Sequence, residues 1–202
     1  MLALSAGFMI AVAMIDLLPE AIERGGQRAA AVALAGYLLV HLTQHTLAGH
    51  FHFGEETHEV SAAVSASALV GLLLHTLVDG VAIASSFAVS ASLGTLVFVA
   101  IFLHKFPEGL AISSLFLAAG AGRRAALLAA AALGVATLVG VLLTSVVPAL
   151  AHDGLALAAG VTLYVAASNL VPEIQKKRGL RMPLAFFLGC ALYAGARSLV
   201  RL

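Results

Sequence analysis

Long apolar segments follow one another along almost the whole chain, separated only by short stretches that contain polar residues, proline or glycine. Hydrophobic residues make up 61% of the 202 residues and charged residues only 10%, and the mean hydropathy is +1.05. A soluble domain of this size could not cover its surface with so few polar side chains. The sequence therefore predicts an all-α, polytopic membrane protein, a bundle of helices that face lipid.

Seven of the segments approach or exceed the ~20 residues that cross the hydrocarbon core of a bilayer. Small residues crowd nearly all of them, which favours close packing of helices in lipid. The connections are short, and 148–153 is expected to be one of them. We expect a single transmembrane domain over 1–202, with spans at 2–20, 29–49, 61–89, 92–118, 123–148, 154–173 and 182–200.

The distribution of Lys and Arg predicts which side of the membrane is cytoplasmic. The side with more basic residues carries Arg123, Arg124, Lys176, Lys177, Arg178 and Arg181. The opposite side carries Arg24, Arg28, Arg197 and Arg201. This places the N-terminus and the His-rich connection at about 50–60 in the cytoplasm. We expect a multi-pass protein of the cell membrane, or of the inner membrane in a Gram-negative cell.

The net charge argues against one class of partner, and the cysteine content argues against an internal disulfide. A net charge of +1 without a basic stripe argues against a nucleic-acid partner. The one cysteine, Cys190, cannot form an internal disulfide. The first span begins almost at Met1 with no basic segment before it, so we expect it to remain in the membrane rather than to act as a cleaved signal peptide. No organic cofactor is expected.

Two motifs with the same spacing of histidine, carboxylate and glycine lie in the middle of adjacent spans. The motif His75-Thr-Leu-Val-Asp79-Gly recurs as His104-Lys-Phe-Pro-Glu108-Gly. In each, an imidazole and a carboxylate are four residues apart, which places both on one face of a helix. Ionisable groups are costly inside a bilayer and usually mark a functional site there. One such pair could be a mutually satisfied buried contact, but two of them point to metal ligands.

Two further spans end with similar polar pairs. The first ends Asp16-Leu-Leu-Pro-Glu20 and the sixth ends Asn169-Leu-Val-Pro-Glu173. The likeness of spans one and six, and of spans three and four, suggests internal repeats around a central site, as in many transporters. Because these two pairs lie near the ends of their spans, a solvated role at the membrane interface is the alternative for them.

Proline inside a span also frees a backbone group. Pro107 has no amide proton, so the carbonyl of Leu103 one turn earlier loses its helical partner. We expect that carbonyl to serve a cation or a polar neighbour.

The ligand types narrow the choice of ion. Imidazole together with carboxylate suits Zn²⁺, Fe²⁺, Mn²⁺, Co²⁺ or Cd²⁺ better than Mg²⁺ or Ca²⁺, which prefer shells made only of oxygen. No thiolate is available among these motifs, which argues against Cu(I).

At these residues the chain resembles the ZIP (Zrt/Irt-like) family of divalent-metal transporters, and its bacterial zinc-transporter branch in particular. The resemblance is carried by the two paired motifs, by the Leu-Pro-Glu and Val-Pro-Glu span ends, by Leu163-Tyr-Val-Ala166, and by the His-rich connection before the first motif. It implies a transporter, not an enzyme, that moves a cation, most simply Zn²⁺, into the cytoplasm by an elevator-type motion.

The resemblance also implies roles for individual residues. His75, Asp79, His104 and Glu108 would be the transport-site ligands. Asp16, Glu20, Asn169 and Glu173 would line the path to or from that site. A cytoplasmic metal-collecting segment would contain His45, His50, His52 and His58, and its alternative is a solvated loop. Membrane lipid surrounds such a protein, and a homodimer is a reasonable assembly.

The chain departs from the family pattern in two ways. Family members usually have eight spans, and the span expected to be missing here is the first. Many bacterial members also have a second metal position, built partly from the residues that follow the two histidines, which here are Thr76 and Lys105. We expect the Lys105 ammonium to occupy that space and to leave a single-ion site. The alternative is a lysine that extends to the lipid headgroups.

Two other functions remain open from the residues. An intramembrane zinc hydrolase would use a metal-bound water, but no His-Glu-x-x-His motif or spare general base is visible. A metal sensor would bind the ion without moving it, and the sequence alone does not separate this from a transporter.

Overall fold

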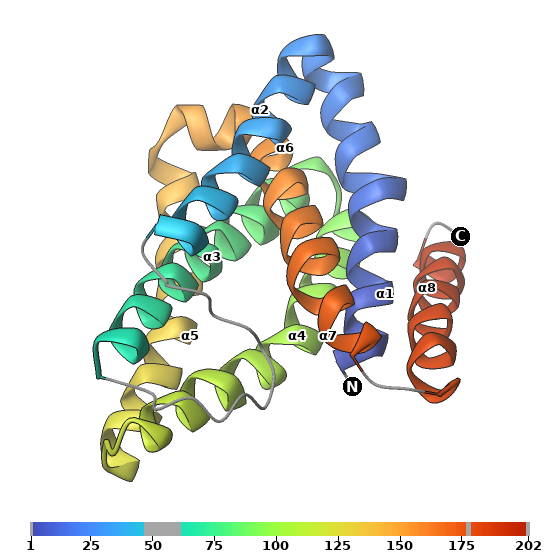
Figure 1. The fold of residues 1–202 in the computed structure, drawn as a ribbon. Coiled ribbons are helices and arrows are strands. Elements are labelled where there is room, and N and C mark those ends of the chain that lie inside the picture. The colour runs from blue at the N-terminus through green and yellow to red at the C-terminus, as the bar shows by residue number, and fades with distance from the viewer. Residues whose placement is uncertain (1, 47–61, 177–178, 201–202) are drawn as a thin grey trace.

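A computed structural model describes residues 2–46, 62–176 and 179–200, which are helical apart from short turns. Figure 1 shows the helices as one bundle. In chain order they are α1 (Leu2–Val12), the π-helix η1 (Ala13–Leu17), α2 (Leu18–Thr46), α3 (Ala62–Val89), α4 (Ala91–Ala118), α5 (Arg123–Val146), α6 (Pro148–Tyr164), the π-helix η2 (Val165–Leu170), α7 (Val171–Gln175) and α8 (Arg181–Val200).

Six helical segments in the described part of the chain are long and apolar enough to cross a membrane. The first of these, Leu2–Gln44, is interrupted at Gly26, whose φ of 57° and ψ of −144° are not helical. A positive φ of this kind is readily adopted only by glycine. The chain reverses direction there (Figure 1), so this segment is a hairpin with two arms. The prediction of a polytopic helical membrane bundle is confirmed.

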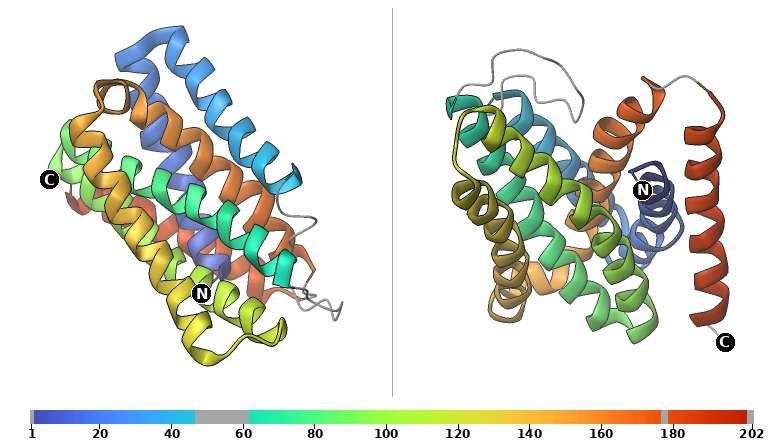
Figure 2. Two further views of the ribbon diagram at one scale, coloured as in Figure 1. Left: turned by 90° about the vertical axis from the view of Figure 1, so that its left-hand side faces the viewer. Right: turned by 90° about the horizontal axis from the view of Figure 1, so that it is seen from below.

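The helices run alternately between two ends of the bundle. One end of the bundle holds the starts of α1, α3 and α5 and the end of α2, and it is called the N-terminal side (Figures 1 and 2). The other end holds the turn of the α1–α2 hairpin at Gly26 and the turn between α3 and α4, and it is called the Gly26 side. α3, α4 and α5 pack against one another, α2 packs along α6, and α8 packs along α1. α3 also contacts α6, which joins the α3–α4–α5 group to the rest of the bundle.

Glycines allow helix backbones to touch at the centre of the bundle. A Cβ added at Gly80 of α3 would lie 2.0 Å from the carbonyl oxygen of Thr137 in α5. A Cβ added at Gly140 of α5 would lie 1.9 Å from the carbonyl oxygen of Leu77 in α3. Such distances leave no room for a side chain, so the expectation of close packing through small residues is confirmed.

The structure corrects one predicted boundary. The sequence predicts a connection at 148–153, but α6 already begins at Pro148. Proline fits the first turn of a helix, where its missing amide proton has no helical partner to lose. Two other prolines each lie two residues after the end of a π-helix, Pro19 after η1 and Pro172 after η2.

Candidate metal site

The turn between α3 and α4 places the two His motifs at the same depth. Ser90 is the only residue between the helices, and its side chain accepts a hydrogen bond from the backbone N–H of Leu93 at 3.1 Å. This is a helix N-cap, which fixes where α4 begins. His75 lies fifteen residues before Ser90 and His104 fourteen residues after it. At 1.5 Å per residue the two histidines therefore face each other across the hairpin.

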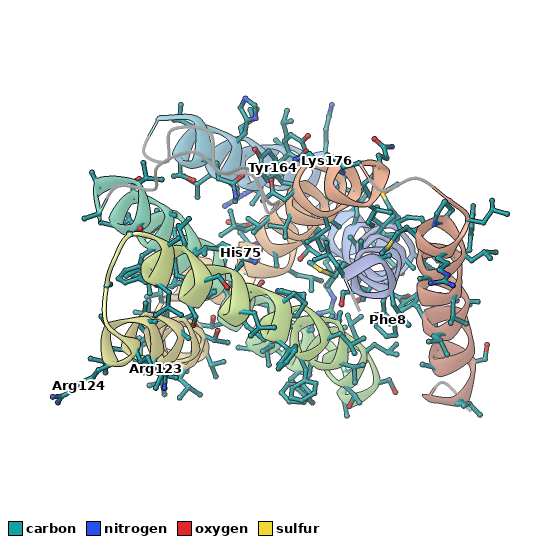
Figure 3. The ribbon with its side chains drawn as sticks, turned by 60° about the horizontal axis from the view of Figure 1, so that its bottom comes forward. Phe8, His75, Arg123, Arg124, Tyr164 and Lys176 are labelled. Carbon is teal, nitrogen blue, oxygen red and sulfur yellow. The ribbon has the colours of Figure 1, made fainter. Side chains whose placement is uncertain are left out.

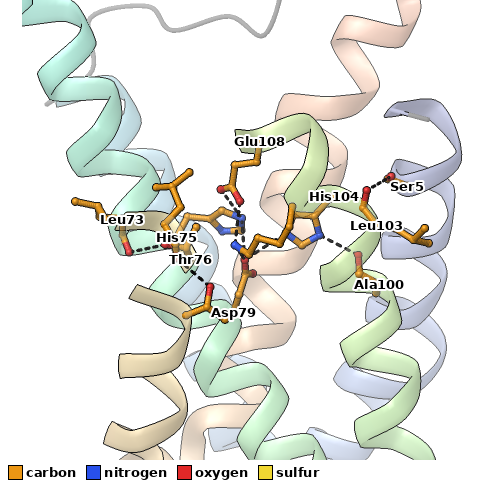
Figure 4. Close-up of polar contacts among 12 residues, drawn as sticks. Ser5, Leu73, His75, Thr76, Asp79, Ala100, Leu103, His104 and Glu108 are labelled. Carbon is orange, nitrogen blue, oxygen red and sulfur yellow. Dashed lines mark hydrogen bonds and ion pairs between the residues drawn. The ribbon is translucent and has the colours of Figure 1, made fainter. Parts of the chain in front are cut away.

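Four ligand-type side chains meet at this depth, one histidine and one carboxylate from each helix (Figure 4). His75, Asp79, His104 and Glu108 each offer one ligand atom, and all four atoms lie within 4.8 Å of one another. All four residues are buried, with 2% to 4% of their surface exposed. His75 lies deep among the helices, whereas Arg123 and Arg124 lie at the edge of the bundle (Figure 3).

The closest approaches already resemble the spacing in a metal shell. His104 Nε2 lies 3.2 Å from Asp79 Oδ2. His75 Nε2 lies 3.5 Å from the same oxygen and 3.7 Å from Glu108 Oε1. A tetrahedral ion with N and O ligands at about 2.0–2.2 Å holds those atoms roughly 3.3–3.6 Å apart. The four residues can therefore surround one divalent ion after small movements.

Neighbouring contacts orient the donors. His104 Nδ1 lies 3.0 Å from the carbonyl oxygen of Ala100. When Nδ1–H donates to that oxygen, Nε2 presents its lone pair to the other three residues, as in many metal sites. Both ring nitrogens of His75 and Oε1 of Glu108 are buried without a hydrogen-bond partner among the described residues. Buried polar atoms usually have partners, so this arrangement suits a cation.

Lys105 contacts both carboxylates. Its Nζ lies 2.6 Å from Asp79 Oδ2 and 2.9 Å from Glu108 Oε2. The side chain is 22% exposed, so the ammonium reaches inward from the rim of the group. The ammonium of Lys105 is thus paired with the carboxylates of Asp79 and Glu108. The hydroxyl of Thr76, the matching residue in the first motif, donates to the backbone carbonyl of Leu73 at 3.1 Å.

The carbonyl freed by Pro107 has a partner on another helix. Ser5 Oγ of α1 donates to the carbonyl oxygen of Leu103 at 3.1 Å (Figure 4). The expectation that this carbonyl serves a cation or a polar neighbour is therefore met by a polar neighbour. The bond ties α1 to α4 one residue before His104. Sequence reasoning did not identify Ser5, because no local pattern links it to Leu103.

Asn169 lies beside the four-donor group on the N-terminal side. It lines a small cavity of about 20 Å³ together with His75, His104 and Glu108. The other walls include Leu2 and Gln44, from the ends of α1 and α2 at that side. η2 carries Asn169, and π-helical turns of this kind are frequent at functional sites.

Asp16 and Glu20 lie toward the opposite end of the bundle. They line a separate cavity of about 50 Å³ with Ser90, Ser92, Val89, Leu93 and Leu96. Asp16 is buried, accepts a hydrogen bond from the Tyr193 hydroxyl, and pairs with Arg197 Nε at 3.0 Å. Glu20 pairs with Arg24 at 2.6 Å. Sequence reasoning missed Tyr193 and Arg197, which lie far from Asp16 along the chain.

Some predicted residues lie outside the described part of the structure. These are His50, His52 and His58 of the predicted His-rich connection, and the side chains of His45 and Glu173.

The family model described as ZIP Zinc transporter matches residues 54–196, well over half of the chain. The chain belongs to the ZIP zinc transporter family. No curated protein matches it. The matched range holds all four donors and Asn169 and begins after the α1–α2 hairpin. Members of this family are transporters and not enzymes, so the hydrolase alternative is dropped. The resemblance predicted from the two His motifs is confirmed at the level of the family.

As a ZIP family member, this multi-pass membrane protein carries a buried His-Asp-His-Glu group that is suitable as a metal site. Sequence reasoning identified all four residues, because their spacing on each helix is a local property.

Proposed function

We propose that this protein carries Zn²⁺ across the membrane into the cytoplasm, with His75, Asp79, His104 and Glu108 as the transport-site ligands. The observation that carries the proposal is the convergence of these four buried donors from two adjacent helices inside the family-matched range. Fe²⁺, Mn²⁺, Co²⁺ and Cd²⁺ have compatible ligand preferences and are further candidate substrates. The motifs favour the bacterial zinc-transporter branch of the family.

The two cavities support a conformation that is open toward the N-terminal side. The cavity that contains His75, His104 and Glu108 also includes Leu2 and Gln44, from the ends of α1 and α2 on that side. The cavity with Asp16 and Glu20 does not include any of the four donors. With the N-terminus cytoplasmic, as the Lys and Arg distribution predicts, this is an inward-facing state. Asn169 and Glu173 would then line the exit, and Asp16 and Glu20 the entrance.

The ion would move as part of a rigid group. The hairpin of α3 and α4 carries all four ligands, and α5 packs against it through Gly80 and Gly140. We propose that this group slides against α6 and α8 in an elevator-type motion. Cross-links that join α3 to α6 should stop uptake, and uptake that persists with such a cross-link would contradict the motion.

Residues 1–202 would act as one transport domain in the cell membrane, surrounded by lipid and assembled as a homodimer. The His-rich segment at 50–60, with His45, would collect metal on the cytoplasmic side. These points follow the family resemblance.

The first test is Zn²⁺ uptake into proteoliposomes by the wild-type protein and by the His104→Ala and Glu108→Ala variants. Saturable uptake that is lost in both variants is expected, because each removes a ligand. His152→Ala is the matched control, since His152 is exposed and lies outside the group. Uptake should persist in that control. A wild-type protein that binds Zn²⁺ without uptake would indicate a sensor instead.

We further propose that the site holds a single ion, with Lys105 in the place of a second one. Wild-type protein should retain one tightly bound Zn²⁺ per chain, measured by elemental analysis after gel filtration. The variant Lys105→Asp should retain more than one, because it replaces the ammonium between Asp79 and Glu108 by a carboxylate. Two tightly bound ions in the wild type would contradict the single-ion site.

A further inference from the structure

Ser86 has a buried hydroxyl without a partner. The residue is 0% exposed, and its Oγ finds no hydrogen-bond partner among the described residues. Hydroxyl side chains within helices commonly donate to a carbonyl three or four residues earlier. Thr76, Thr137 and Thr144 do so here. Ser86 therefore loses the hydration of its hydroxyl on burial and gains no hydrogen bond in return.

Ser86 lies on the same face of α3 as the two metal-ligand candidates of that helix. It follows Asp79 by seven residues and His75 by eleven, which are close to two and three turns of 3.6 residues. Ser86 therefore lies ~10 Å beyond Asp79 toward the Gly26 side. Three residues further, Val89 lines the cavity that also contains Asp16 and Glu20. This face of α3 thus joins the two polar regions.

On the faces of α3 and α4 that carry the four ligand candidates, the barrier between those regions is otherwise apolar. On α3, Ala82 lies between Asp79 and Ser86 and is buried. On α4, the positions four, seven and eleven residues before His104 are Ala100, Val97 and Leu93, all buried. A cation that crosses this barrier would meet Ser86 at the depth of Leu93.

We propose that the Ser86 hydroxyl is a transient oxygen ligand for the divalent cation on its way from the Asp16–Glu20 cavity to the four-donor site. The inference rests on the proposed transport function. A hydroxyl offers two lone pairs and carries no charge. Such a ligand is suited to passage, because an ion must bind well enough to enter and weakly enough to leave. Polar groups kept in a membrane interior without a structural partner point to function.

Ser85 is a matched control next in the sequence. It is also buried, but its Oγ donates to the carbonyl oxygen of Leu150 in α6 at 3.4 Å. Ser86→Ala should lower the maximal rate of Zn²⁺ uptake by about tenfold, the size typical of losing a supporting metal contact. Its Zn²⁺ affinity, measured by calorimetry in detergent, should match that of the wild type. Ser85→Ala should transport at a rate close to that of the wild type.

Two cysteine variants give a second measurement, which does not depend on whether the substitution itself slows Zn²⁺ uptake. A thiol at position 86 is a soft ligand that retains Cd²⁺. Cd²⁺ should therefore inhibit Zn²⁺ uptake by Ser86→Cys at lower concentrations than it inhibits the wild type or Ser85→Cys. The native Cys190 is present in all three proteins.

The outcomes separate the two proposals. If Ser86→Ala takes up Zn²⁺ at the wild-type rate, the role of Ser86 is overturned and the transport function stands. The same holds if Ser85→Ala is as slow as Ser86→Ala. Equal Cd²⁺ sensitivity of the two cysteine variants would also overturn that role. Absence of wild-type uptake would overturn the transport function, and this inference with it.

Discussion

Two segments of this protein share one sequence pattern and differ in what surrounds them. Asp16-Leu-Leu-Pro-Glu20 and Asn169-Leu-Val-Pro-Glu173 each begin inside a π-helix and have a proline two residues after it ends. They lie on opposite sides of the four-donor group. Asn169 lines a cavity with His75, His104 and Glu108. Asp16 is instead bound by Tyr193 and Arg197 of α8.

The difference shows that a polar residue inside this bundle can hold helices together or can border the candidate metal site. The Asp16 carboxylate is neutralised by a guanidinium from a helix that packs mainly against α1. Asn169 is uncharged and therefore needs no counter-ion in order to stay at the cavity. The Asp16 segment thus ties η1 to α8, whereas the Asn169 segment borders the candidate metal site.

The largest expected effect is on stability at Asp16. Asp16→Ala leaves Arg197 and the Tyr193 hydroxyl without their acceptor, which should lower the free energy of unfolding by about 2–3 kcal/mol. Thermal unfolding in detergent would measure it. The double variant Asp16→Asn, Arg197→Gln should recover part of the loss, because it removes both charges. An unfolding temperature equal to that of the wild type in Asp16→Ala would show that this contact does not anchor α8.

An intermediate effect is expected at Asn169, on transport instead of stability. Asn169→Ala should weaken Zn²⁺ affinity or uptake by about tenfold, as loss of a group next to metal ligands commonly does. Its unfolding temperature should stay near the wild-type value. Ser168→Ala is the matched control, because the Ser168 hydroxyl bonds to Tyr37 at 3.0 Å and does not line the cavity. If Asn169→Ala lowers the unfolding temperature and leaves uptake unchanged, Asn169 has a structural role and the contrast with Asp16 is wrong.

The smallest effect is expected at Glu20. Its ion pair with Arg24 joins neighbouring turns of α2, and the two side chains are 29% and 55% exposed. Pairs of this kind contribute about 0.5 kcal/mol or less, so Glu20→Gln should leave thermal unfolding almost unchanged. Any reduction of Zn²⁺ uptake by Glu20→Gln would then come from the place of Glu20 in the proposed entrance path and not from a loss of stability. A loss of stability as large as that of Asp16→Ala would mean that the whole segment is structural.

The difference between contacts within one helix and contacts between distant helices explains how much of the candidate site could be predicted from the sequence. His75 with Asp79, and His104 with Glu108, were assigned from spacing on single helices, and the structure brings them together. The freed Leu103 carbonyl was also foreseen, because Pro107 acts on its own helix. Its partner Ser5 was not, since that choice depends on how α1 packs against α4.

The sequence by itself determined that this chain is a helical membrane protein and which residues share a face, because hydropathy and the period of the helix are local properties. Tertiary structure decided which polar groups were already satisfied. Asp16 and Arg197 lie 181 residues apart along the chain. They meet because α8 packs on α1 at Gly7 and Gly189, where backbones come too close for any side chain. Such contacts between distant helices depend on the whole packing of the bundle, which no local pattern contains.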